Sequence, residues 1–214
     1  LRSGVTKTAD AISFHFYGGT TFSSRRGPQP LREAVETQTQ VMRQNKFPVV
    51  PVWDSESGGI FRTSYQKFSN PFGDTAPREG AEMMPKAVAA VLASGLERWF
   101  YYAAFNATHP GELAAFAASD INDTIKMPFQ PMAVAISLLE GREFVRQENA
   151  ADGIVHLVFS GRGETVHMLW KNNGQATLKA PANTRRVLNM WGRKVQKSNS
   201  LRLDTAPIYV VTTA

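Results

Sequence analysis

The sequence contains no cysteine and no long apolar run. Without cysteine the chain has no disulfide, no thiol nucleophile and no thiolate metal site. No segment approaches the roughly 20 apolar residues that a membrane helix needs, and Leu1–Val5 lacks the apolar core of a signal peptide. We therefore expect no membrane partner. The compartment stays open, and we favour a secreted or periplasmic location over a cytoplasmic one.

The net charge of +6 is unevenly distributed along the chain. Residues 1–149 balance their charges, whereas residues 150–214 carry nine Lys or Arg against three Asp or Glu. A basic module invites a nucleic-acid interpretation, but these charges are scattered along strand-like segments without an RNA-binding signature or a basic helix. We therefore expect no nucleic-acid partner and interpret the charge as a solvated basic face, with affinity for acidic polysaccharide as the alternative.

Residues 1–141 alternate strand-like and helix-like segments. The expected strands are 10–17, 47–53 and 96–105, and the expected helices are 30–45, 80–93 and 128–139. In the first helix, Pro30 suits the first turn, and an apolar stripe consists of Leu31, Val35 and Met42. A β-α-β-α-β-α order predicts parallel strands joined by right-handed crossovers.

Residues 142–214 consist of short strand candidates separated by turns that contain Gly, Asn or Pro. The candidates are 144–148, 154–159, 165–170, 176–179, 186–190, 201–203 and 208–211. This spacing is typical of an antiparallel β-sandwich. The sequence therefore predicts an α/β domain over residues 1–141 and a small all-β accessory domain over residues 142–214.

The second predicted strand ends in the motif Trp53-Asp-Ser-Glu-Ser-Gly58. Side chains alternate along a strand, so one face is expected to hold Val50, Val52, Asp54 and Glu56. If the two valines fill the interior of a parallel barrel, Glu56 points into its mouth, where chemistry takes place and where the following glycines leave room for a ligand. A carboxylate there can attack an anomeric carbon. The alternative is a strand-end acid that caps a loop or pairs with an arginine, and the segment fits both.

The first predicted strand ends in Ser13-Phe-His-Phe-Tyr17. His15 and Tyr17 are two residues apart and share a face. Both can hydrogen-bond a nucleophilic carboxylate, fix its rotamer and keep it ionised. The alternatives are a core histidine and a rim tyrosine, but their joint position beside Glu56 favours a site.

The third predicted strand is rich in aromatic residues. A sugar ring stacks its apolar face on an aromatic side chain, and we select Tyr102 as this platform, with Asn106 at the rim. Packing between the strand and a helix is the expected role of Trp99, Phe100 and Phe105.

The order of these motifs resembles strands six, seven and eight of clan A glycoside hydrolases, which are retaining (β/α)8-barrel glycosidases. The string Ser13–Tyr17 resembles the corresponding strand of family 5 enzymes. A barrel followed by a small β-sandwich is similar to families 30 and 39, and the sandwich strands after such barrels resemble residues 166–170, 187–192 and 206–210. The resemblance implies an α/β plus all-β fold: a partial (β/α)8 barrel, strands six to eight with their helices, and a small antiparallel β-sandwich.

The resemblance also implies roles for individual residues. Glu56 corresponds to the nucleophile, Tyr17 to the tyrosine that contacts it, and His15 to the accompanying histidine. Tyr102 corresponds to the floor of the first sugar subsite, where many members have Trp, and the other expected substrate contacts are Asn106 and Trp53. No cofactor and no metal are expected, and the substrate is a glycoside or an oligo- or polysaccharide whose sugar the sequence does not specify.

Retaining hydrolysis requires two carboxyl groups about 5–5.5 Å apart, as nucleophile and as acid/base. In clan A the acid/base lies on the fourth strand, and no segment of this chain matches that strand. We therefore expect weak or no activity unless self-association or a chain that supplies an N-terminal half-barrel completes the site. The alternative function is a carbohydrate-binding or scaffolding protein that cuts no bond.

Overall fold

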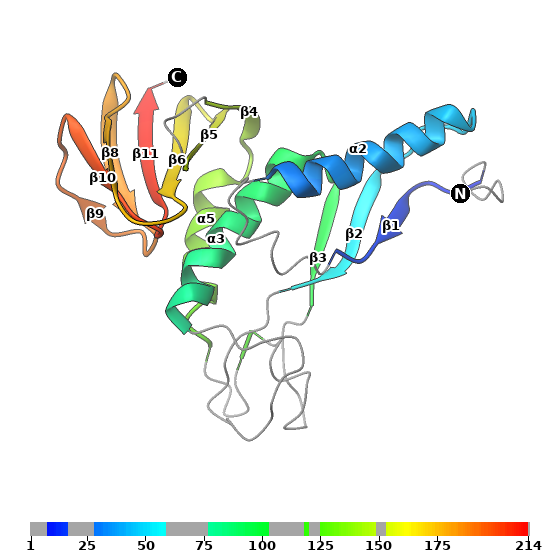
Figure 1. The fold of residues 1–214 in the computed structure, drawn as a ribbon, viewed down its shortest axis with the longest axis horizontal. Helices are drawn as coiled ribbons and strands as arrows, with labels where there is room; N and C mark the ends of the chain where they lie inside the picture. The colour runs from blue at the N-terminus through cyan, green and yellow to red at the C-terminus, as the bar shows by residue number, and fades with distance from the viewer. Residues whose placement is uncertain are drawn as a thin grey trace.

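The first half of the chain builds a three-stranded parallel sheet from alternating strands and helices (Figure 1). The computed structural model describes residues 8–16, 28–58, 77–102, 118–119, 125–148 and 153–213. The elements are β1 (Ile12–Phe14), α2 (Gln29–Gln44), β2 (Val52–Ser57), α3 (Pro77–Ser94), β3 (Arg98–Tyr101) and α5 (Phe129–Leu139). Strand β2 lies between β1 and β3 and pairs parallel with both, as the alternation of segments predicted.

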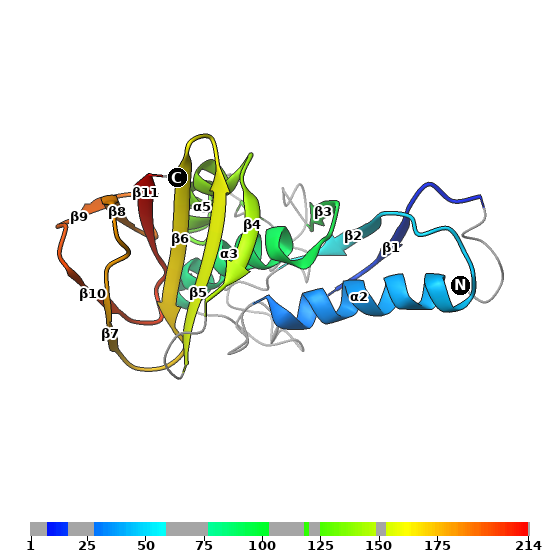
Figure 2. The same cartoon turned by 90° about the horizontal axis from the view of Figure 1, so that it is seen from above.

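Helix α2 covers one face of this sheet, along β1 and β2 (Figure 2). It begins after Pro28, with a proline in its first turn, and ends at Asn45, whose amide bonds to the carbonyl of Val41. The predicted stripe of Leu31, Val35 and Met42 is buried, and part of it packs on Val52 of β2. The face of the sheet turned toward α2 is thus its apolar face.

The second half consists of antiparallel strands in two sheets. A six-stranded sheet has the order β4-β5-β6-β11-β8-β9, and a two-stranded sheet pairs β10 with β7. Their bounds are β4 (Glu143–Gln147), β5 (Ile154–Gly161), β6 (Glu164–Lys171), β7 (Ala176–Lys179), β8 (Thr184–Asn189), β9 (Lys194–Val195), β10 (Ser200–Leu203) and β11 (Ile208–Thr213). An apolar cluster that includes Leu169, Val187, Leu201 and Val210 lies between the two sheets.

The largest buried cluster joins the two halves of the chain. Helices α3 and α5 contribute Val88, Ala89, Ala135 and Leu139, and the six-stranded sheet contributes larger side chains that include Phe159, Met168, Trp170 and Tyr209. The last helix of the first half therefore packs on the antiparallel sheet. This core spans the proposed boundary at residue 141, which itself stays a prediction.

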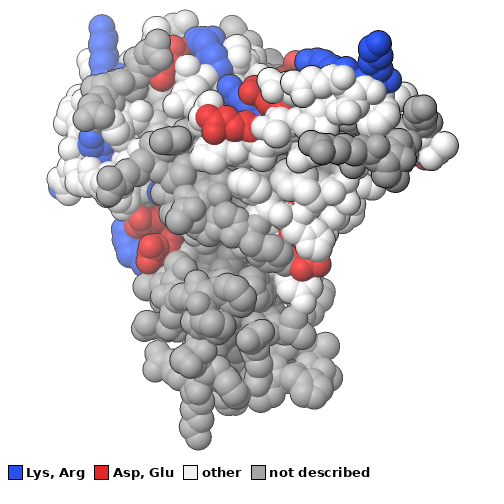
Figure 3. All heavy atoms as spheres, turned by 45° about the vertical axis from the view of Figure 1, so that its right-hand side comes forward, with Lys and Arg blue, Asp and Glu red and all other residues white. Residues whose placement is uncertain are grey.

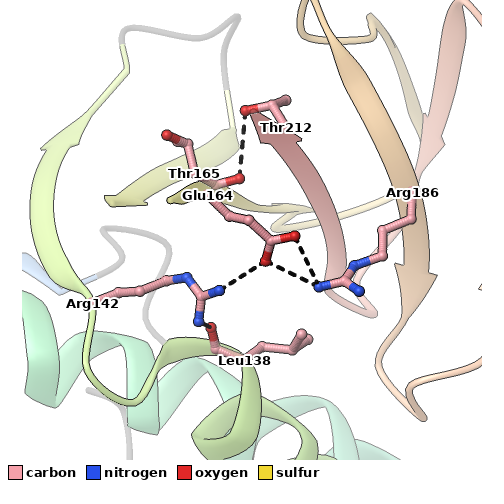
Figure 4. Close-up of polar contacts among 6 residues, drawn as sticks. All are labelled: Leu138, Arg142, Glu164, Thr165, Arg186 and Thr212. Atoms are coloured by element: carbon pink, nitrogen blue, oxygen red, sulfur yellow. Dashed lines mark hydrogen bonds and ion pairs between the residues drawn. The ribbon is translucent and has the colours of Figure 1, made fainter. Parts of the chain in front are cut away.

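A buried ion pair reinforces the same junction (Figure 4). The guanidinium of Arg142 donates to the carbonyl oxygen of Leu138, at the end of α5, over 2.6 Å, and to the carboxylate of Glu164 on β6 over 3.0 Å. Arg186 on β8 reaches the same carboxylate at 3.1 Å. The Arg142 side chain is only 6% exposed, so Glu164 neutralises a cation that water does not reach.

Three sequence-based expectations need correction. The second strand covers Val52–Ser57, later than the predicted 47–53, so the polar motif lies within the strand. Phe100 does not pack between strand and helix but is 47% exposed. The two-residue strand β9 (Lys194–Val195) was not predicted, because two residues are too few for a periodic pattern.

Candidate functional site

The candidate site lies on the face of the parallel sheet opposite α2 and α3. Phe14 and Val52 pack toward α2, and Trp99 and Tyr101 pack toward α3. Because side chains alternate along a strand, the neighbours of these residues point to the other face. Within the described part of the chain that face is open: His15 has a 54% exposed side chain and Phe100 is 47% exposed.

An irregularity in the sheet register decides where Glu56 points. Asp54 pairs with Trp99 and Ser57 with Tyr101, so three residue steps on β2 face two on β3. Such a bulge interrupts the alternation of side chains. Asp54 and Ser57 are both fully buried toward the helices, and Glu56 lies on the open face.

The predicted common face of Val52, Asp54 and Glu56 is wrong. Val52 packs on α2 and Asp54 shares its side, whereas Glu56 lies on the open face. Strict alternation would have pointed Glu56 at the helices as well. The extra residue on β2 restores the predicted outcome, because it turns Glu56 to the side of His15.

The structure brings His15 and Glu56 together at the carboxyl ends of β1 and β2. The Nε2 of His15 lies 3.9 Å from the Oε2 of Glu56, and the side chains are 54% and 37% exposed. An imidazole at this distance limits the rotamers of the carboxylate. The pair therefore has the arrangement of a positioned carboxylate that solvent or a ligand can reach.

Aromatic side chains continue this face toward β3. Trp53 has the Arg98 guanidinium 5.3 Å from its ring centroid and the Phe100 ring centroid at 6.0 Å. Its indole Nε1–H donates to Glu97 over 2.6 Å. These contacts fix the Trp53 ring beside the exposed side chains of Arg98 and Phe100. A fixed aromatic ring of this kind offers a flat apolar surface to a sugar or to another protein segment.

Tyr102 and Gly58 mark the end of the site on β3. The backbone N–H of Tyr102 donates to the carbonyl oxygen of Ser57 over 2.9 Å. A Cβ atom on Gly58 would lie 2.2 Å from the Tyr102 carbonyl oxygen, so only glycine fits there. The sequence suggested that this glycine leaves room for a ligand, but the structure shows that it leaves room for the neighbouring backbone. Tyr17 and Asn106 lie outside the described residues.

A buried polar network lies beneath the site; the sequence indicates that Asp54 is buried or hydrogen-bonded, but not that its partners include Ser57 and Trp99. The Asp54 carboxylate accepts hydrogen bonds from the Ser57 hydroxyl and, at 3.4 Å, from the Phe16 backbone N–H. The Trp99 indole N–H donates to the Ser57 oxygen over 2.8 Å. Burial raises the pKa of Asp54 above its ordinary value, and the hydrogen bonds and nearby His15 offset only part of this effect.

Charges on the molecular surface near the parallel sheet are mixed. In Figure 3 the acidic and basic side chains that are described lie next to one another, and most of the described surface carries no charge. Among the described residues, no cluster of three or more His, Asp or Glu side chains could hold a metal ion. No helix in the described ranges is long and apolar enough to cross a membrane.

No protein-family profile matches the sequence, and no curated protein matches it. Solved structures do resemble the fold. A family 39 glycoside hydrolase from Bacteroides cellulosilyticus WH2 has a TM-score of 0.63 at 18% identity, covering 84% of this chain and 38% of that one. A glucosidase from Croceicoccus marinus gives 0.59 at 10% identity, with 96% and 54% covered. A GH30 endoxylanase from Clostridium papyrosolvens C71 gives 0.53 at 13% identity, with 98% and 50% covered.

These similarities concern the fold. They confirm the resemblance to clan A glycoside hydrolases that the order of the motifs predicted. The chain spans between 38% and 54% of the length of these three structures. The fold is a mixed α/β structure with antiparallel sheets, of the kind found in the C-terminal regions of these glycosidases.

Proposed function

We propose that the chain is the C-terminal part of a retaining glycoside hydrolase, with Glu56 as its nucleophile. In this interpretation residues 1–141 form strands six to eight of a (β/α)8 barrel and residues 142–214 form an accessory β-sandwich. The observation that carries the proposal is the 3.9 Å approach of His15 to Glu56 on the open face, at the carboxyl ends of adjacent parallel strands. Active sites of (β/α)8 barrels lie at these strand ends.

The chemistry assigned to the pair follows from their positions. Glu56 would attack the anomeric carbon and form a glycosyl-enzyme intermediate, which water then hydrolyses. His15, with Tyr17, would hold the attacking carboxylate ionised and correctly oriented. Trp53, Tyr102 and Asn106 would contact the sugar, since aromatic faces stack on the apolar face of a pyranose.

We propose that the acid/base carboxyl comes from outside the described residues. Retaining enzymes place it about 5–5.5 Å from the nucleophile. Asp54, two residues before Glu56 on β2, is fully buried on the opposite face of the sheet. We propose that association with a second chain, either another copy or an N-terminal half-barrel, covers the open face and supplies this group.

A substrate with an excellent leaving group tests the nucleophile without the acid/base, because departure of dinitrophenolate needs no proton. The protein is incubated with a panel of 2,4-dinitrophenyl 2-deoxy-2-fluoroglycosides and analysed by intact-mass and peptide mass spectrometry. We expect a glycosyl adduct on the peptide that contains Glu56. Glu56→Gln should abolish the adduct, and Glu36→Gln, in α2, should keep it. An adduct that persists in Glu56→Gln would exclude Glu56 as nucleophile.

A second candidate function is binding of acidic polysaccharide without turnover. It is favoured by the stretch between Glu164 and Asp204, which contains no Asp or Glu but contains Lys171, Lys179, Arg185, Arg186, Arg193, Lys194, Lys197 and Arg202. All of these except Lys171 are exposed. Retention on polygalacturonate but not on cellulose, lost at about 0.5 M salt where charges are screened, would support this candidate, whereas retention on both would contradict it.

A further inference from the structure

The buried carboxylate of Asp54 collects hydrogen bonds from both strands that carry the site pair. The backbone N–H of Phe16, the residue after His15, donates to its Oδ1 atom over 3.4 Å. The backbone N–H of Glu56 also donates to the carboxylate, and the Ser57 hydroxyl donates to Oδ2. A single side chain therefore holds the backbone next to His15 and the backbone of Glu56.

The indole N–H and the backbone N–H of this network can only donate. An indole N–H can only donate, so the Trp99 Nε1–H occupies a lone pair of the Ser57 oxygen at 2.8 Å. When Asp54 is ionised it can only accept, so the Ser57 hydroxyl proton points to it and both carboxylate oxygens act as acceptors. The carboxylate satisfies these donors, whereas an amide at this position would turn an NH2 group toward one of them.

The same contacts hold the irregular part of β2. Between Asp54 and Ser57 the chain has one residue more than β3, and Asp54 binds the N–H of Glu56 and the hydroxyl of Ser57 inside this segment. Without that support the extra residue has no partner on β3 to fix its conformation. The direction of the Glu56 side chain therefore depends on a group that lies on the opposite face of the sheet.

We propose that Asp54 is the positioning residue of the site. It sets the approach of His15 to Glu56 by binding the backbone N–H of Phe16, next to His15, and the backbone N–H of Glu56. The inference rests on the proposed function only in naming Glu56 the nucleophile. Asp54 itself is fully buried and touches no substrate.

Solution NMR on the full chain tests the inference without any need for turnover. Two observables are recorded: hydrogen exchange of the Phe16 and Glu56 amides, and the NOE between the His15 ring and the Glu56 side chain. In Asp54→Asn we expect both amides to exchange about tenfold faster or more, as for loss of a charge-assisted hydrogen bond, and the NOE to disappear. Glu56→Gln is the matched control, which keeps Asp54 and should keep the protection of both amides.

Variants at Ser57 keep the test decisive if Asp54→Asn does not fold. Ser57→Ala removes one donor and the link to Trp99, so the NOE should weaken, and Ser57→Thr should restore it because the hydroxyl returns. An unchanged NOE and unchanged amide protection in Asp54→Asn, or in Ser57→Ala, would overturn the proposal. These readouts are independent of glycosyl transfer, so a failed mass-spectrometric test of Glu56 would leave their result standing.

Discussion

His156 and His167, on the adjacent antiparallel strands β5 and β6, share a hydrogen bond of 2.8 Å between the Nε2 atom of the first and the Nδ1 atom of the second. One ring must donate and the other accept, so the bond requires at least one neutral imidazole. Burial, together with the charge of His167, lowers the pKa of His156 to about 4, and burial lowers that of His167. Glu148 opposes both shifts but lies at the surface.

Acid should therefore destabilise the antiparallel part of the chain. The unfolded histidines take up protons near pH 6.5 and the folded pair only at lower pH, so their contribution to stability is complete above pH 6.5 and is lost as pH falls toward 4. We expect the free energy of unfolding in urea to fall by on the order of 2 kcal/mol between pH 7.5 and pH 4.5.

Replacing the pair isolates its contribution. The double variant His156→Leu, His167→Leu should lose most of this pH dependence while retaining the fold. Asp54 has the opposite effect on stability as the pH falls. Its pKa is raised in the folded state, so the folded state binds the proton more readily than the unfolded state and is stabilised by acid. A variant whose unfolding free energy still falls as steeply as that of the wild type would assign the acid sensitivity to other groups.

The Glu164 carboxylate should contribute more to the free energy of unfolding than an exposed acid in a similar ion pair. It neutralises Arg142, whose side chain is 6% exposed and whose buried Nε atom has no hydrogen-bond partner among the described residues. Glu164→Gln leaves that cation buried and should lower the free energy of unfolding by about 2 kcal/mol. Glu148→Gln is the control: its pair with Arg146 is 2.7 Å long but exposed, and should contribute under about 0.5 kcal/mol. Equal losses in the two variants would contradict the burial argument.

Gly58 should tolerate no side chain. A Cβ atom there would lie 2.2 Å from a backbone oxygen of the next strand, which cannot rotate away. Gly58→Ala should separate the ends of β2 and β3 and lower the unfolding free energy by about 2 kcal/mol. Ser55→Ala, in the same strand, should change it by less than about 0.5 kcal/mol. An alanine accepted without loss at position 58 would show that the strands separate easily.

Local patterns were sufficient to predict much of the fold. The apolar stripe of α2 and the alternation of strands with helices are periodic signals within one segment. The order of strand-end motifs indicated the glycosidase-like fold and placed His15 and Glu56 at neighbouring parallel strand ends, although the side to which Glu56 points depends on the register irregularity.

The remaining features depend on pairing between distant segments. The register irregularity arises from how β2 meets β3, and the Ser57–Trp99 hydrogen bond joins residues 42 positions apart. No periodicity within one strand contains that information. Phe100 was mispredicted for a different reason: it directly follows Trp99 in β3, and alternation along the strand places the two side chains on opposite faces. A visible signal was the run of polar residues from Asp54 to Ser57, directly after the apolar segment 47–53.

The open face of the parallel sheet should control association if a second chain completes the site. Phe100 is 47% exposed beside Trp53 on this face, and Val145, on the edge strand β4, is 48% exposed. A charge buried at an apolar interface costs several kcal/mol. Phe100→Lys should therefore weaken association at least about tenfold. Val145→Lys, with the same exposure, should leave it unchanged.

Size-exclusion chromatography with light scattering over a range of protein concentrations gives the measurement. The wild type should elute above the 23.6 kDa of one chain and Phe100→Lys closer to it. Circular dichroism then checks that both variants are folded. A wild-type monomer at all concentrations would leave an N-terminal half-barrel as the proposed partner, whereas equal effects of Phe100→Lys and Val145→Lys would show that the two chains meet through some surface other than the open face.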